Sequence, residues 1–232
     1  TRRGPRLIDA TRPALLLATQ NNHKIREMGE ILSGLLGSPF GVSPDRERPN
    51  PLVSILDFPG VVIPDESGNT YAENAEAKAR AAARETGLIA LADDSGLEVD
   101  ALSGAPGIHS ARWLGEIPQS QKNRRIIEAL KEVHPAERTA RFHCAVAVCR
   151  PGQGREVGAM RVFEAALAGF ISEKESGVEG FGYDPIFLPE EEGRPGRRTL
   201  AEIPPEEKNR ISHRARALRL AADFLSSLIS DG

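Results

Sequence analysis

Two adjacent carboxylates, Asp93 and Asp94, follow the apolar run Leu88–Ala92 and come directly before Ser95 and Gly96. The run has the length and composition of a strand buried on both faces, which predicts that the two acids stand at the carboxyl end of that strand. Carboxylate oxygens at such a position suit Mg²⁺ and the chemistry of phosphates. Because side chains alternate along an extended chain, we expect only one of the two acids to face a given ligand. An acidic turn with capping Asp and Ser fits the same residues equally well.

A second polar group follows another apolar run near the start of the chain. Thr19–Lys24 reads TQNNHK, comes after ALLLA and opens a segment with helical spacing. Hydroxyl, amide and ammonium donors at a helix N-terminus favour an anion, although polar residues cap most helices. Neither GxxxxGK[ST] nor a GxGxxG after a strand occurs, so the P-loop and Rossmann fingerprints are absent.

Acidic and aromatic residues offer two further candidates. Asp65 and Glu66 precede a Ser-Gly turn and could give a second oxygen ligand to a metal held by Asp94, although such acids are usually solvated. The segment Phe181–Pro185 joins aromatic rings to a glycine, as a base-stacking platform or a strand-entry turn would. The five histidines form no HxH or HExxH and the two cysteines no CxxC, which argues against zinc.

Whether the basic side chains near the C-terminus can converge on one ligand depends on where a helix is interrupted. In one continuous helix, Lys208 and His213 would stand about 140° apart around the axis. Because Ser212 is a good N-cap, we expect a short turn that ends near Ile211 and a new helix that begins at His213, which would let both side chains converge. An amphipathic helix with a solvated basic face is the alternative.

The elements that must position these groups alternate between strand and helix early in the chain. The apolar pattern predicts strands at 14–19, near 52–56, at 88–92 and at 185–188, and a long hairpin over 142–171 with its turn at 151–154. It predicts helices at 22–36, at 70–86 with a Thr70/Glu73 capping box and a stop at Gly87, after a Ser120 cap, and up to about 228. The class is therefore α/β with a mixed sheet.

Composition narrows the class of protein. The chain has 232 residues, 40% hydrophobic and 27% charged, with a net charge of -3, which is typical of a globular protein and gives no support to nucleic-acid binding. No apolar run approaches the roughly 20 residues that span a bilayer. Cys144 and Cys149 would lie roughly 16 Å apart in one strand, beyond disulfide reach, so we expect a reducing compartment. We expect the Arg-rich residues 1–13 to be a flexible extension or a cloning remnant rather than part of a transit peptide.

Six segments, in order, resemble the inosine triphosphate pyrophosphatase family, also called the Ham1-like or RdgB-like purine nucleoside triphosphate pyrophosphatases. They are ATQNNHK at 18–24, TYAENA at 70–75, ADDSGLEVDALSGAPGIHSAR at 92–112, FHCAV at 142–146, GFGYDPIF at 180–187 and EEKNRISHR at 206–214. The resemblance implies an elongated mixed sheet with flanking helices forming two lobes around a nucleotide cleft, as one domain over 14–232. It also implies a cytoplasmic homodimer. Trp113, Ala165 and a longer 39–60 region depart from the family pattern.

The same resemblance implies Mg²⁺-dependent hydrolysis of ITP, dITP and XTP between the α and β phosphates. Asp94 would be the general base and a metal ligand, and Asp65 the second ligand, with Glu66 as its competitor. The triphosphate would be held by Thr19, Gln20, Asn21, Asn22, His23, Lys24, Ser95 and Lys208. The base and sugar would be held by Phe181, Gly182, Tyr183 and Asp184, with His213 and Arg214 donating to the purine 6-oxo group. A nucleotide-binding regulatory protein without catalysis is the alternative.

Overall fold

The computed structural model describes residues 15–37, 52–154 and 156–230. The prediction of a flexible extension at residues 1–13 and most of the 39–60 region lie outside these ranges. Contacts divide the chain into two compact units. Unit 1 comprises the chain up to Asp94 with 145–164 and the segment from Ala217 onward, and unit 2 comprises 95–144 and 165–216. That residues 14–232 form a single domain stays a prediction.

The described strands form one mixed seven-stranded sheet in the order β2-β1-β3-β4-β5-β6-β7. They are β1 (Leu15–Leu17), β2 (Leu52–Ser54), β3 (Ile89–Val99), β4 (Thr139–Pro151), β5 (Val157–Ile171), β6 (Phe187–Glu191) and β7 (Arg194–Pro195). β1 pairs in parallel with β2 and β3, whereas β6 pairs antiparallel with β5 and β7. The α/β class, the mixed sheet and the long β4–β5 hairpin are confirmed.

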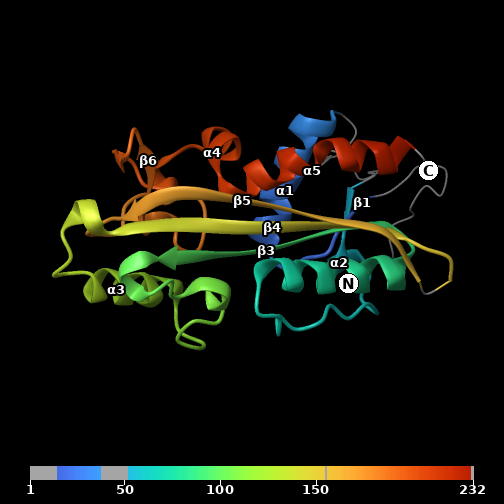
Figure 1. Ribbon diagram of the computed structural model, residues 1–232, viewed down its shortest axis with the longest axis horizontal. Coiled ribbons are helices and arrows are strands. Elements are labelled where there is room, and N and C mark those ends of the chain that lie inside the picture. Colours follow the sequence, from blue (N-terminus) through green and yellow to red (C-terminus); the bar gives the residue numbers. More distant parts are fainter. Residues whose placement is uncertain (1–14, 38–51, 155, 231–232) are drawn as a thin grey trace, which may run out of the picture. The chain divides into compact units, whose positions relative to one another are not determined.

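The described helices are α1 (Asn22–Leu36), α2 (Tyr71–Thr86), α3 (Gln119–Ala129), α4 (Pro205–Ile211) and α5 (His213–Ser230). Within unit 1, α2 lies on one side of the strands and α5 on the other (Figure 1). No helix among the described residues is long and apolar enough to cross a membrane.

Local signals set the ends of α2 as predicted. The Thr70 hydroxyl accepts the Glu73 backbone N–H, and the helix stops at Gly87, whose φ of 70° is left-handed. The Glu73 carboxylate accepts the N–H of Asn69, one residue before the N-cap, so the expected reciprocal bond is displaced by one position. Ser120 was expected to cap α3, but Pro118 is the N-cap and Ser120 lies inside the helix. Pro118 suits this place because its fixed φ fits the entry to a helix.

Strand β3 corrects the prediction that Asp93 and Asp94 stand at the carboxyl end of a strand. It runs to Val99, so both acids lie within it, and the turn comes later, around Gly104 and Gly107. β1 stops at Leu17, opposite Leu91 of β3, while the 13-residue β4 adjoins β3 on its other side. A polar segment that looks like a turn stays extended because a neighbouring strand satisfies its backbone groups.

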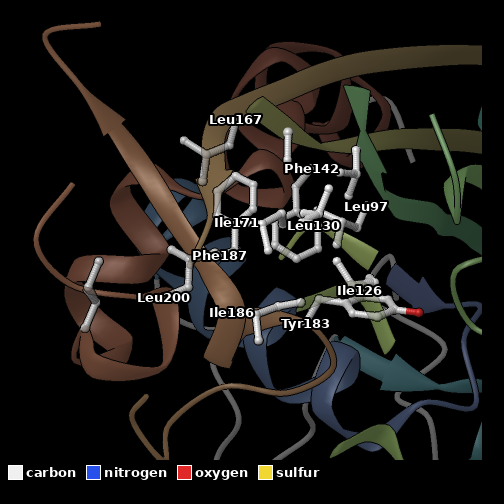
Figure 2. Close-up of a cluster of buried hydrophobic side chains, with 13 residues drawn as sticks. Leu97, Ile126, Leu130, Phe142, Leu167, Ile171, Tyr183, Ile186, Phe187 and Leu200 are labelled. Carbon is white, nitrogen blue, oxygen red and sulfur yellow. The ribbon is translucent and has the colours of Figure 1, made fainter. Parts of the chain in front are cut away.

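Unit 2 has its own apolar core. Side chains from β3, α3, β4, β5 and β6 gather there with Leu200 and Ile203 (Figure 2). The rings of Phe142 and Phe187 pack with centroids 4.7 Å apart. This core supports the segment on which the aromatic candidates lie, because Tyr183 belongs to it. Cys144 and Cys149 are buried and are not joined by a disulfide, as predicted.

Candidate active site

Asp94 is a buried carboxylate held by two side chains of α2. It is only 3% exposed. The Asn74 amide donates to Oδ2 at 2.8 Å, and Lys78 Nζ lies 3.9 Å from Oδ1. Burial raises the pKa of Asp94, and the nearby Glu66 charge raises it further, against the lowering effects of Lys78 and Asn74. A carboxylate with a raised pKa is a stronger base than a solvated one.

Asp93 has different partners, as the alternation along a strand predicts. Its side chain is fully buried, and Oδ2 lies 3.0 Å from Lys24 Nζ. Its backbone carbonyl accepts a hydrogen bond from Lys78 at 2.7 Å. Asp93 therefore binds Lys24 of α1 through its carboxylate and Lys78 of α2 through its backbone carbonyl. Asp94 accepts the hydrogen bond from Asn74.

Lys78 is the centre of this acidic cluster, although it was not among the site residues predicted from the sequence. Its ammonium lies 2.7 Å from the Glu66 carboxylate as well as close to Asp94. Burial opposes its charge, but the surrounding carboxylates outweigh burial and raise the pKa of Lys78. A signal was present in the sequence, because Asn74 and Lys78 stand four residues apart in an Ala-rich helix and so share one face.

The cluster contains Glu66 rather than Asp65. Asp65 is exposed, and its backbone carbonyl accepts the Ser67 N–H. Glu66 is half-buried and contacts Lys78.

Mg²⁺ fits the donor set of this cluster. In the described part of the chain, no group of three or more His, Cys, Asp or Glu side chains is arranged to hold a metal. Mg²⁺ needs no such group, since it keeps several waters and binds one or two carboxylates together with substrate phosphates. The carboxylates of Glu66 and Asp94, which Lys78 contacts in common, provide oxygen ligands of this kind.

The TQNNHK segment forms the capped N-terminus of α1. Asn21 is the N-cap, and its side-chain oxygen accepts the backbone N–H groups of His23 and Lys24. The Thr19 hydroxyl accepts the Asn21 N–H at 3.3 Å. Residues 20–23 are exposed. The segment therefore offers exposed amide side chains at the positive end of a helix, next to an ammonium already paired with Asp93.

In unit 2, two cations lie over the Phe181 ring. Lys208 Nζ is 4.9 Å and the Arg214 guanidinium carbon 5.6 Å from the ring centroid. Asp184 fixes this arrangement, because its Oδ2 accepts both the Phe181 N–H at 2.7 Å and Lys208 Nζ at 2.8 Å. The turn that carries Phe181 is thus tied to α4 by a buried ion pair.

The expected break in the C-terminal helix is confirmed. α4 ends at Ile211, Ser212 is extended with ψ 154°, and α5 begins at His213. The Ser212 hydroxyl accepts the Ala215 N–H, as an N-cap does.

The break brings Arg214, rather than His213, to the ring that Lys208 contacts. The imidazole of His213 stacks on Phe142, with centroids 4.7 Å apart. Arg214 is 1% exposed and donates to the Ser95 hydroxyl at 3.0 Å. Ser95 therefore contacts the guanidinium assigned to base recognition.

Tyr183 lies in the apolar core of unit 2. It is 5% exposed, belongs to the apolar cluster, and its hydroxyl donates to the Ser110 carbonyl at 3.0 Å. Ser110 in turn accepts the Leu97 N–H. The packing and the hydrogen bond of Tyr183 thus hold the turn from Phe181 to Asp184 in place.

Deprotonation of the Tyr183 hydroxyl should lower the free energy of unfolding at alkaline pH. Burial raises the pKa of Tyr183 from 10.0 to about 12, because it disfavours the phenolate. The folded state therefore holds this proton more tightly, and the resulting stabilisation is present below pH 10 and is lost as pH rises toward about 12. Urea unfolding between pH 9 and 12 should show a steeper loss for the wild type than for Tyr183→Phe. Parallel curves for the two proteins would contradict this.

The chain is similar to proteins of known family over most of its length. The Ham1 family profile matches residues 15–224. The dITP/XTP pyrophosphatase of Geobacter sulfurreducens is 44% identical over 212 residues, covering 91% of this chain and 96% of that protein. The protein of the same name from Escherichia coli K12 is 43% identical, covering 91% and 97%. The solved structure of a HAM1 protein from Coxiella burnetii is 36% identical with a TM-score of 0.72, covering 93% of this chain and 99% of that one.

Proposed function

The chain belongs to the Ham1 family, and from this premise we propose that it hydrolyses ITP, dITP and XTP to the nucleoside monophosphate and pyrophosphate. The relatives named dITP/XTP pyrophosphatase support this substrate class. The observation that carries the proposal is the buried Asp94 carboxylate, held beside Asn74 and Lys78 and raised in pKa by burial. Such a group suits the removal of a proton from water.

Asp94 is the general base in the proposed reaction. It accepts a proton from a water molecule whose oxygen bonds to the α-phosphorus. The bond from the α-phosphorus to the oxygen that bridges to the β-phosphate then breaks, and pyrophosphate leaves with that electron pair. Lys78 offsets the carboxylate charges, so that Asp94 and Glu66 can remain ionised close together.

Glu66 and Asp94 are the residues that would hold Mg²⁺. When bound, the metal supplies charge neutralisation for the phosphates and orients them for attack. Glu66 replaces Asp65 in this role because Glu66 shares the cation Lys78 with Asp94.

Paired variants test that assignment. Glu66→Gln should raise the Mg²⁺ concentration needed for half-maximal activity by about tenfold or more. Mutation of a residue that only supports a metal ligand already lowers metal affinity by about this factor. Asp65→Asn should leave the requirement within about twofold of the wild type, because Asp65 is exposed. A magnesium titration of both variants at fixed ITP measures this. The opposite ranking of the two variants would restore Asp65 as the ligand.

The triphosphate is proposed to bind at Thr19, Gln20, Asn21, Asn22, His23 and Lys24, with Ser95 and Lys208. Exposed amide groups at the positive end of α1 support the assignment of residues 19–24. Lys24 and Lys208 are paired with Asp93 and Asp184, so a phosphate would share each ammonium with its carboxylate.

Base recognition is proposed to use the Phe181 ring and the guanidinium of Arg214, with Gly182, Asp184 and His213 in the same segments. The two cations over the ring support a site for an electron-rich group. A donor aimed at the purine 6-position pairs with the oxygen of hypoxanthine but meets the amino group of adenine. The unsatisfied donor costs about 1 to 3 kcal/mol, which disfavours ATP.

A substrate panel tests the proposed function. The protein is incubated with ITP, dITP, XTP, GTP and ATP, with Mg²⁺ or with EDTA, and pyrophosphate and orthophosphate are assayed separately. Pyrophosphate from the deaminated nucleotides, lost with EDTA, is the expected result. Orthophosphate release, or ATP turnover as fast as that of ITP, would contradict it. Nucleotide binding without any turnover would favour the regulatory alternative.

The assembly and compartment belong to the same proposal. We expect a homodimer in the cytoplasm that acts on free nucleotides, without nucleic-acid or membrane partners. The net charge of -3 supports a small-molecule substrate over nucleic acid. Light scattering after gel filtration measures the mass, and a monomer would contradict the dimer.

A further inference from the structure

Asn74 occupies a special place in the acidic cluster. It lies in the first turn of α2 and is 2% exposed. Its Oδ1 accepts the backbone N–H of Gly68 at 2.8 Å, and its Nδ2 donates to Asp94 Oδ2 at 2.8 Å. One buried amide therefore bonds both a loop and the carboxylate to which catalysis is assigned.

The orientation of this amide is determined by its partners. The Gly68 N–H can only donate, so the atom that faces it must be the amide oxygen. The NH₂ group then necessarily faces Asp94. Among side chains of this size, Asn alone offers an acceptor and a donor on one rigid plane, since an ionised Asp has only acceptors and Leu has neither.

The bond to Asn74 restricts the rotation of the Asp94 carboxylate. With Oδ2 held by the amide, Oδ1 is the oxygen on the side of Lys78, 3.9 Å from Nζ. Gly68 comes two residues after Glu66, so the same amide also ties the loop that carries the second acid. The two carboxylates thus take their relative placement from Asn74 as well as from Lys78.

The loop approaches Asn74 so closely that residue 68 must be small. A Cβ added at Gly68 would meet Asn74 Oδ1 and Glu73 Cβ at 2.8 Å each. The backbone of Gly68 would have to move away from the amide to relieve those contacts. Substitution here therefore disturbs one end of the Asn74 bridge and leaves the Asp94 end chemically intact.

We propose that Asn74 is a positioning residue that fixes the orientation of the Asp94 carboxylate relative to the Glu66 loop. The inference rests on the proposed function, because it assigns Asn74 an effect on the base of that reaction. It predicts an effect on the chemical step rather than on substrate affinity, since Asn74 is buried and hydrogen-bonds to Asp94.

Steady-state kinetics with ITP test the proposal. Asn74→Leu, which keeps a similar volume and removes both bonds, should lower kcat by about 10²-fold, the cost of a misplaced catalytic group. KM and the affinity for a non-hydrolysable ITP analogue should stay within about threefold. Gly68→Ala should lower kcat in the same direction, and it carries the test if Asn74→Leu does not fold.

Thr70→Ala is the matched control. It removes the N-cap bond of the same helix and costs about 1 kcal/mol of stability, but it leaves the Asp94 bond in place. If its kcat falls as far as that of Asn74→Leu, or if Asn74→Leu and Gly68→Ala keep wild-type kcat, the proposal is overturned.

A crystal structure separates this inference from the proposed function. If the wild type releases no pyrophosphate, the function fails, and the structure of Asn74→Leu or Gly68→Ala decides the positioning role. An Asp94 carboxylate turned away from its wild-type orientation supports the role, and an unchanged orientation refutes it.

Discussion

Asp94→Asn should nearly abolish ITP turnover, with kcat reduced by about 10²- to 10⁴-fold, the usual contribution of a general base. The amide has the shape of the carboxylate but cannot accept the proton of the attacking water. We expect nucleotide binding to be largely kept, because the side chains proposed to contact the phosphates and the base directly are unchanged. The fold should also tolerate the change, since burial already raises the pKa of Asp94 and so disfavours its charged form.

Single-turnover kinetics and calorimetric titration together measure this result. Asp100→Asn is the matched control, because Asp100 is exposed just beyond the end of β3 and pairs with Arg141. Its kcat should equal that of the wild type. Loss of nucleotide binding in Asp94→Asn would show that Asp94 serves binding, and would remove it as the base.

Lys208→Met should lower the free energy of unfolding by about 3 to 5 kcal/mol, because it leaves a buried charge without its partner. Lys208 and Asp184 are 5% and 3% exposed, and their charged atoms are 2.8 Å apart. Asp184 also accepts the Phe181 N–H, so the turn that carries the aromatic ring should loosen. Urea unfolding at neutral pH measures the loss.

An exposed ion pair provides the comparison. Arg198 lies 2.6 Å from Glu207, with side chains 50% and 43% exposed. Arg198→Met should therefore cost only about 0 to 1 kcal/mol. Adding Asp184→Asn to Lys208→Met should recover part of the stability, since the amide oxygen can still accept the Phe181 N–H. Equal losses for Lys208→Met and Arg198→Met would contradict the argument from burial.

Features that depend on neighbours along the chain could be predicted well. The bounds of α1, the start and stop of α2, and the break at Ser212 were all expected. Each rests on periodicity or on a capping residue within a few positions, so the chain itself carries the information. The family and the mixed sheet were also recognised, because six ordered motifs are distributed over the chain.

Features that depend on distant partners could not be predicted in the same way. Asp93 and Asp94 were expected at the end of a strand, with an acidic turn as the alternative, yet they lie inside β3. Whether a polar segment stays extended depends on the strand beside it. The hydroxyl of Tyr183 reaches the carbonyl of Ser110, 73 positions away, which no local pattern indicates.

The sequence by itself determined which chemical groups this protein has and the order in which they occur, because side-chain chemistry and local propensity are properties of the chain. Only the tertiary structure decided which of them meet. It placed Glu66 rather than Asp65 beside Lys78, brought Lys78 and Asn74 to Asp94, and placed Arg214 rather than His213 over Phe181. These choices depend on burial and on ion pairing between separate elements, which contribute free energy only once the elements have packed.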